Sequence, residues 1–93
     1  MIIVHDIFVC KPGNASKLAK LFKEAMKGNK EVINIMTDMT GQFNRVVFEH
    51  SVENLADLEA RLQKYATDPA IKEKMKGYTD LWETGSRELL RVM

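Results

Sequence analysis

The sequence lacks most of the features that identify a class of protein at once. A single cysteine, Cys10, excludes an intrachain disulfide and favours a reducing compartment, for which we expect the cytoplasm. There is no basic leader and no apolar run near the ~18–20 residues of a membrane span, so we expect no membrane attachment. Fourteen Lys and Arg against thirteen Asp and Glu leave a net charge of +1, without the basic excess typical of nucleic-acid-binding domains.

Motifs of known chemistry are also absent. The sequence contains no phosphate-binding glycine loop, nucleophile elbow or Walker-type string. Its two histidines are too few for a metal site, which normally takes about three or four ligands. The 93 residues, with 45% hydrophobic and 29% charged side chains, suffice for one core and not for two. We therefore expect a single domain, 1–93, without a metal and without a nucleic-acid partner.

Four segments rich in β-branched and aromatic residues predict strands. They span residues 1–10, 32–40, 45–50 and 86–93. The stretch 41–44 has about the length of a hairpin loop, so we expect the second and third strands to pair antiparallel. The last segment, SRELLRVM, is also compatible with a helix, and we favour the strand.

Apolar residues at helical spacing predict two helical regions between the strands. The first spans 14–27 and the second 51–66, with Arg61 expected among the charged residues on the outside. Asp68 and Pro69 then restart a helix, because an N-cap residue is followed by proline in the first turn. The order β-α-β-β-α-β predicts a ferredoxin-like α+β fold, with a four-stranded antiparallel sheet and both helical regions on one face.

The first predicted strand, 1–10, carries apolar side chains on both of its faces. Helices that lie on one side of the sheet cover only one of these faces, and a chain of this length has no residues left for the other. A large exposed apolar face favours aggregation. We therefore expect a homodimer, in which two sheets pack face to face about a twofold axis and close into a shared α+β barrel.

Three short segments give the chain a resemblance to a known superfamily. The Lys-Pro-Gly turn at 11–13, the helix restart at 68–69 and the segment GYTDLW at 77–82 resemble the dimeric α+β barrel superfamily, in particular its NIPSNAP-like and antibiotic-biosynthesis-monooxygenase-like members. The resemblance covers nearly the whole chain. It implies a pocket between the sheet and the helices for a small apolar or aromatic ligand, with a polar residue of the first strand, here Asp6, projecting into it.

The resemblance leaves the activity open. It implies a cofactor-independent monooxygenase or isomerase, and the alternative is a non-enzymatic dimerisation or ligand-sequestering module. The haem-degrading branch of the superfamily uses a histidine of the second helical region as its iron ligand. This sequence has no histidine between Ser51 and Asp80, and only Tyr65 or Tyr78 would remain to bind iron. We therefore expect the protein not to degrade haem, and we expect no cofactor.

Asp6 and His50 are the candidate catalytic residues. An ionised carboxylate inside an apolar strand is costly to bury unless it is paired. Asp6 is therefore expected either to form an ion pair with Arg45, Arg87 or Arg91, or to have a raised pKa and act as a general base on a phenolic or α-carbonyl proton. The ferredoxin-like order makes the first and third strands neighbours, so that Asp6 and His50 would approach and form an acid–base pair.

Tyr65, Tyr78 and Trp82 are the candidate ligand-binding residues. Their rings are expected between the broken second helical region and the sheet, where aromatic walls suit a flat apolar ligand. The alternative is that the three rings fill the core, each with its polar tip at a partner.

Overall fold

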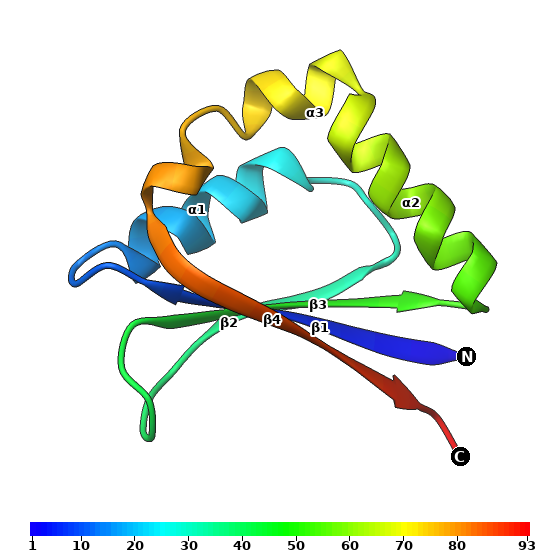
Figure 1. Ribbon diagram of the computed structural model, residues 1–93, viewed down its shortest axis with the longest axis horizontal. Helices are drawn as coiled ribbons and strands as arrows, with labels where there is room; N and C mark the ends of the chain where they lie inside the picture. The colour runs from blue at the N-terminus through cyan, green and yellow to red at the C-terminus, as the bar shows by residue number, and fades with distance from the viewer.

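The computed structural model describes all 93 residues and confirms the ferredoxin-like α+β fold (Figure 1). The strands are β1 (Ile2–Cys10), β2 (Val32–Thr37), β3 (Arg45–Val52) and β4 (Trp82–Arg91). They form one sheet in the order β2-β3-β1-β4, and every neighbouring pair is antiparallel. Strand β1 is therefore central, between β3 and β4.

All helices lie on the same face of this sheet (Figure 1). They are α1 (Ala15–Ala25), α2 (Leu55–Thr67), α3 (Pro69–Lys74) and the 3₁₀ helix η1 (Tyr78–Asp80). Helices α2 and α3 form an arch over the sheet, and η1 leads from this arch into β4. None of the helices has both the length and the apolar character that a membrane crossing requires.

Local signals in the sequence set the beginnings and ends of the arch helices. The Asn54 side chain accepts a hydrogen bond from the Asp57 backbone N–H at 2.9 Å and caps α2. Asp68 caps α3 in the same way, accepting from the Ala70 N–H at 2.9 Å, and Pro69 occupies the first turn as expected. Gly77 follows at φ 84°, a left-handed conformation that favours glycine and ends the helical path before η1.

The strand boundaries differ by more than two residues from the sequence-based ones at two places. Strand β4 begins at Trp82 instead of residue 86, because residues 82–85, despite their weak strand signal, pair with the end of β1 around Gly85. Strand β2 ends at Thr37, so the connection to β3 spans 38–44 and Met39, expected in the strand, is an exposed loop residue. The Asp38 side chain accepts from the Arg45 N–H at 2.7 Å and closes this longer loop.

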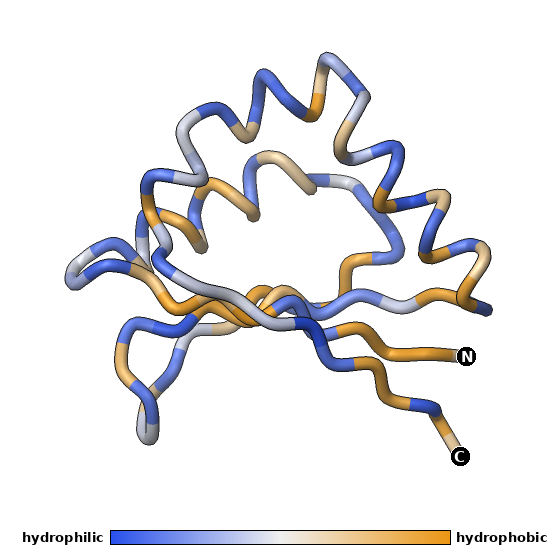
Figure 2. Tube along the Cα trace, in the orientation of Figure 1, coloured by the Kyte–Doolittle hydropathy of each residue, from blue (hydrophilic) through white to orange (hydrophobic).

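The core fills the space between the sheet and the helices. Its largest cluster joins α1 to the centre of the sheet, and its buried members are Cys10, Leu18, Phe22, Ala25, Met26, Val46, Phe48 and Met75. A smaller cluster of Val4, Val52 and Leu58 fixes α2 to the opposite end of the sheet. Figure 2 shows apolar residues at the N-terminal end of β1, a largely polar first half of β4, and alternating apolar and polar residues along the helices.

The opposite face of the sheet, here called the open face, carries no helix (Figure 1). The odd-numbered residues of β1 lie on it, among them Ile3, Ile7 and Val9, and each is only partly buried. Leu90, which pairs with Ile3, is 43% exposed. Within one chain, the helix side of β1 buries Val4, Asp6 and Cys10, whereas no residue of β1 on the open face is buried.

Candidate ligand-binding site

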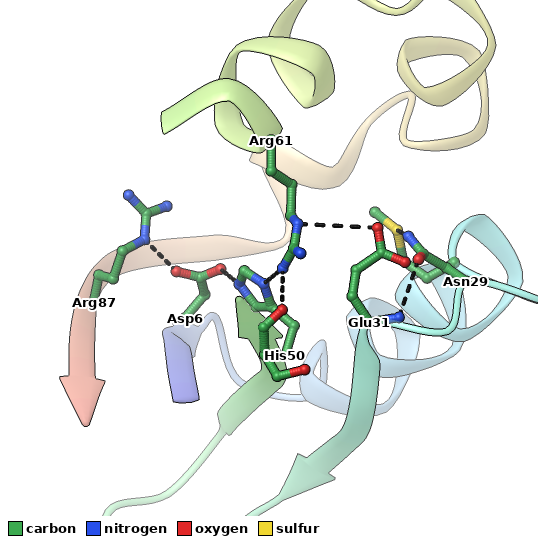
Figure 3. A network of polar contacts seen from close by, with 8 residues as sticks. Asp6, Asn29, Glu31, His50, Arg61 and Arg87 are labelled. Carbon is green, nitrogen blue, oxygen red and sulfur yellow. Dashed lines mark hydrogen bonds and ion pairs between the residues drawn. The ribbon is translucent and has the colours of Figure 1, made fainter. Parts of the chain in front are cut away.

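The polar centre of the helix-covered face is Asp6, in the middle of β1. The side chain points towards the helices, and the residue is only 9% exposed. Its Oδ1 accepts a hydrogen bond from Arg87 Nε on β4 at 2.5 Å, and its Oδ2 accepts one from His50 Nε2 on β3 at 3.0 Å (Figure 3). The structure thus brings Asp6 and His50 together, as the strand order predicts.

The register of the sheet explains which arginine pairs with Asp6. Asp6 lies directly opposite Arg87 on β4, and directly opposite residues of an antiparallel pair point to the same face. Arg45 lies opposite Val9, and Arg91 lies opposite Ile2. Of the three arginines considered from the sequence, Arg87 is therefore the partner.

Arg61 of α2 completes the polar centre, and the prediction that it lies on the outside of the helix is wrong. Its Nη1 donates to the Ser51 backbone carbonyl at 2.7 Å and to His50 Nδ1 at 2.8 Å, and its Nε lies 4.0 Å from Glu31 Oε1 (Figure 3). The signal was present in the sequence: Arg61 follows the buried Leu58 by three residues and therefore shares its helix face.

These contacts fix the tautomer of His50. A guanidinium only donates hydrogen bonds, so His50 Nδ1, which faces Arg61, must accept and carries no proton. The proton of the neutral ring is then on Nε2 and is donated to Asp6. Arg61, His50, Asp6 and Arg87 thus form one chain of hydrogen bonds, here called the polar chain, in which all donors point towards the Asp6 carboxylate.

The polar chain determines the protonation state of Asp6. Burial raises the pKa of this carboxyl, but the hydrogen bonds from His50 and Arg87 and the positive charge of Arg87 outweigh burial, and the pKa is lowered from its ordinary value of 3.8. The raised-pKa alternative considered from the sequence is therefore wrong, because two donors stabilise the ionised form. Asp6 is an ionised, fully paired carboxylate at neutral pH.

A cavity of about 450 Å³ lies beside the polar chain, between the sheet and the helical arch. Ten of its thirteen lining residues are hydrophobic. The lining comprises Asp6, Phe8, Phe22, Met26, Phe48, Leu62, Tyr65, Ala66, Ile71, Lys72, Met75, Tyr78 and Arg87. The polar chain therefore contributes Asp6 and Arg87 to the cavity surface. His50 is 0% exposed, does not line the cavity and donates its hydrogen bond to Asp6.

Two of the three aromatic residues predicted from the sequence reach this cavity. Tyr65 and Tyr78 line it, and Trp82 does not. The Trp82 ring packs edge-on against Phe8, with centroids 5.3 Å apart, and supports the cavity wall from outside. Sequence reasoning did not select Phe8, Phe22 and Phe48, although the alternation of β1 and β3 and the stripe of α1 place all three on the helix-covered side.

Tyr65 carries a hydroxyl that the protein leaves unsatisfied. Its Oη is shielded from solvent and forms no hydrogen bond. Burial raises the pKa of the Tyr65 phenol, and the nearby Glu31 and Asp6 charges act in the same direction, against the Arg61 charge and the neighbouring Asn29 side chain. The hydroxyl is therefore a neutral donor on a cavity-lining residue, without a protein partner.

The second histidine lies away from the cavity, on the open face. His5 Nε2 is 2.8 Å from Glu49 Oε2, and Asn34 Nδ2 donates to Glu49 Oε1 at 2.9 Å. The hydrogen bonds from His5 and then Asn34 lower the pKa of the Glu49 carboxyl. Neither face of the sheet gathers three His, Cys, Asp or Glu side chains in a geometry that would hold a metal ion.

Comparisons by sequence alone and by structure give different results. No protein-family profile matches the chain, and no curated protein matches it. The fold, by contrast, is similar to that of a NIPSNAP domain protein from Burkholderia xenovorans, at a TM-score of 0.84 and 16% identity over 100% of this chain and 95% of that one.

Two further structures are similar in the same way. A NIPSNAP family protein from Agrobacterium tumefaciens has a TM-score of 0.82 and 17% identity over 99% of this chain and 92% of that one. A candidate antibiotic biosynthesis monooxygenase from Chloroflexus aurantiacus has a TM-score of 0.71 and 9% identity over 99% of this chain and 92% of that one. The chain thus has the fold shared by NIPSNAP domain and antibiotic biosynthesis monooxygenase proteins, which confirms the resemblance at the level of fold.

Proposed function

We propose that this protein binds a small, mostly apolar molecule in the cavity between its sheet and its helical arch. The observation that carries the proposal is the cavity itself: about 450 Å³, mostly hydrophobic, and lined by three phenylalanine and two tyrosine rings. Ligand pockets typically have ~300–1,000 Å³ and apolar walls with a few polar groups. A packing defect would be much smaller, because protein interiors leave few voids larger than a water molecule.

The polar groups of the cavity favour recognition over acid–base catalysis. Asp6 has a lowered pKa and accepts two hydrogen bonds, so it is a weak base. The polar chain ends in an arginine at each side, and a guanidinium releases no proton at physiological pH. We therefore assign Asp6 and His50 a positioning role, in which they hold Arg87 at the cavity and Arg61 against the sheet.

The proposal is tested by filling the cavity. Ala66 lines it on α2, and Ala66→Phe would occupy part of the volume, whereas Ala60→Phe changes an exposed alanine of the same helix outside the lining. Binding of 2-naphthylmethanol is measured by isothermal titration calorimetry. We expect Ala66→Phe to weaken binding by about tenfold or more and Ala60→Phe to leave it unchanged. Equal affinity in both variants would place the ligand elsewhere.

We further propose that the protein acts as a homodimer through its open face. The uncovered β1 side chains include Ile3, Ile7 and Val9. Four strands of about eight residues, spaced ~4.8 Å apart with a rise of ~3.3 Å per residue, present a face of roughly 500 Å² in projection. This size suits an interface that buries about 800 Å² of accessible surface per partner. A twofold axis lets the same face serve both copies.

Ile7 tests the dimer, because it lies near the middle of the open face opposite Val47 and Ser86. Light scattering after size exclusion at micromolar concentration should give about twice the 10.6 kDa of one chain. Ile7→Lys should reduce this mass to that of one chain, whereas Met39→Lys in the exposed hairpin loop should not. A wild-type mass of one chain would refute the dimer.

A further inference from the structure

We propose that the ligand of the cavity is an organic carboxylate, whose apolar body lies against the aromatic wall and whose charged end binds Arg87 and Lys72. This inference rests on the proposed function, since it names the class of molecule that the cavity takes. It is carried by the charges on the cavity wall and by the hydrogen-bonding capacity that the protein leaves unused there.

The charged residues of the lining leave an excess of one positive charge. They are Asp6, Lys72 and Arg87. Asp6 and Arg87 form an ion pair with each other, whereas Lys72 forms none with any residue. The remaining lining residues are neutral. Lys72 is an exposed residue of this otherwise apolar lining, so its ammonium group is unpaired and in contact with solvent, and a site with this charge favours an anion over a cationic molecule.

Arg87 has unused donors of suitable geometry. Its Nε is occupied by Asp6, and its two terminal nitrogens make no hydrogen bond to the protein. Figure 3 shows these nitrogens pointing away from Asp6. The side chain is 45% exposed, so the donors are accessible. A guanidinium fork matches the two oxygens of a carboxylate, and charge-assisted pairs of this kind are the strong ones.

Asp6 makes Arg87 suited to this role without competing for the ligand. The short contact to Nε holds the base of the guanidinium, so less side-chain freedom is lost when an anion binds. Both Asp6 oxygens already accept hydrogen bonds, from Arg87 and from His50. The Arg87 ion pair balances the Asp6 charge, so Asp6 offers a cationic ligand no unpaired negative charge, whereas an anionic ligand meets donors that are free.

Matched ligands test the inference. The probes are 2-naphthoate and decanoate, each compared with the alcohol of the same carbon skeleton, 2-naphthylmethanol and decanol, by isothermal titration calorimetry at neutral pH. We expect at least one carboxylate to bind about tenfold or more tightly than its alcohol. Lys72→Gln and Arg87→Gln should each remove most of this preference and leave the affinity for the alcohol within about twofold.

Lys74→Gln is the control, because Lys74 belongs to the same short helix α3 and does not line the cavity. It should keep the full preference for the carboxylate. If carboxylate and alcohol bind equally well, or if Lys72→Gln and Lys74→Gln behave alike, the carboxylate inference is wrong while the cavity remains a binding site. If none of the four probes binds, the proposed function fails and the inference with it.

Discussion

Replacing Asp6 by asparagine tests the interpretation of the polar chain as a structural device. The carboxylate accepts from Arg87 and from His50, and the asparagine side chain offers a single acceptor oxygen. His50 must keep its donor on Nε2, because Arg61 faces Nδ1. Only one of the two donors can therefore keep its hydrogen bond to the side-chain oxygen. The other donor then faces the amide NH₂ group, which cannot accept a hydrogen bond.

The exposed fractions of the two partners decide which bond is lost. His50 is 0% exposed and has no alternative acceptor, whereas the Arg87 side chain is 45% exposed and can turn to water. The variant therefore keeps the His50 bond and loses the Arg87 ion pair. A hydrogen bond to a charged group contributes about 1.5–3 kcal/mol. Hydration of the released guanidinium recovers part of this, so we expect a loss of about 1–2 kcal/mol in the free energy of unfolding.

The pH dependence gives the same experiment a sharper result. The pKa of Asp6 is lowered by folding, so the carboxylate adds stability that is fully present above its unfolded value of 3.8 and is lost as the pH falls through the folded pKa. Urea unfolding of both proteins is measured from about pH 7 to about pH 2, so that the series passes below the ordinary carboxyl pKa. The difference between their free energies of unfolding should be largest near neutrality and should narrow at acid pH. A difference that is absent at neutral pH, or constant over the whole range, refutes the reasoning.

Three other substitutions probe the fold and the cavity. Leu18→Ala removes a fully buried side chain of α1 and should lower the free energy of unfolding, measured by urea titration, by about 2–5 kcal/mol. Asn54→Ala removes the N-cap of α2 and should cost about 1 kcal/mol, with Asn54→Asp as the conservative control. Tyr65→Phe removes a buried hydroxyl that makes no hydrogen bond, so stability should stay the same or rise by up to about 1 kcal/mol, and a loss above 1 kcal/mol would show that Oη has a partner.

The strand order and the pairing of Asp6 could be predicted because both follow from regular periodicity. Once β1 and β3 are neighbours, the even-numbered residues Asp6 and His50 must share the helix-covered face. The start of β4 was harder to predict, since residues 82–85 have little strand propensity and are held by pairing with β1. Long-range pairing of this kind leaves no local signal in the sequence.

The cavity was only partly predictable for a different reason. Tyr65 and Tyr78 were predicted from the sequence as large aromatic residues, and both line the cavity. Which aromatic side chains reach the cavity depends on how their neighbours pack, and the sequence does not show this. Trp82 turns against Phe8 instead. Arg61 was misassigned because a charged residue is normally placed in solvent, although its spacing from Leu58 pointed inward.

The helical arch has few fully buried side chains within its two helices. Leu58 is the one buried residue of α2, and α3 has none. Beyond these, Met75 directly after α3 is buried, Leu62, Tyr65 and Ile71 pack partly buried against the core, and Arg61 holds α2 to the sheet through Ser51 and His50. Segments with so few buried side chains open at a free-energy cost well below that of global unfolding. We therefore expect α2 and α3 to open while the β-sheet stays intact, which would give the proposed ligand a route into the cavity, and amide exchange should be faster in α2 and α3 than in β1.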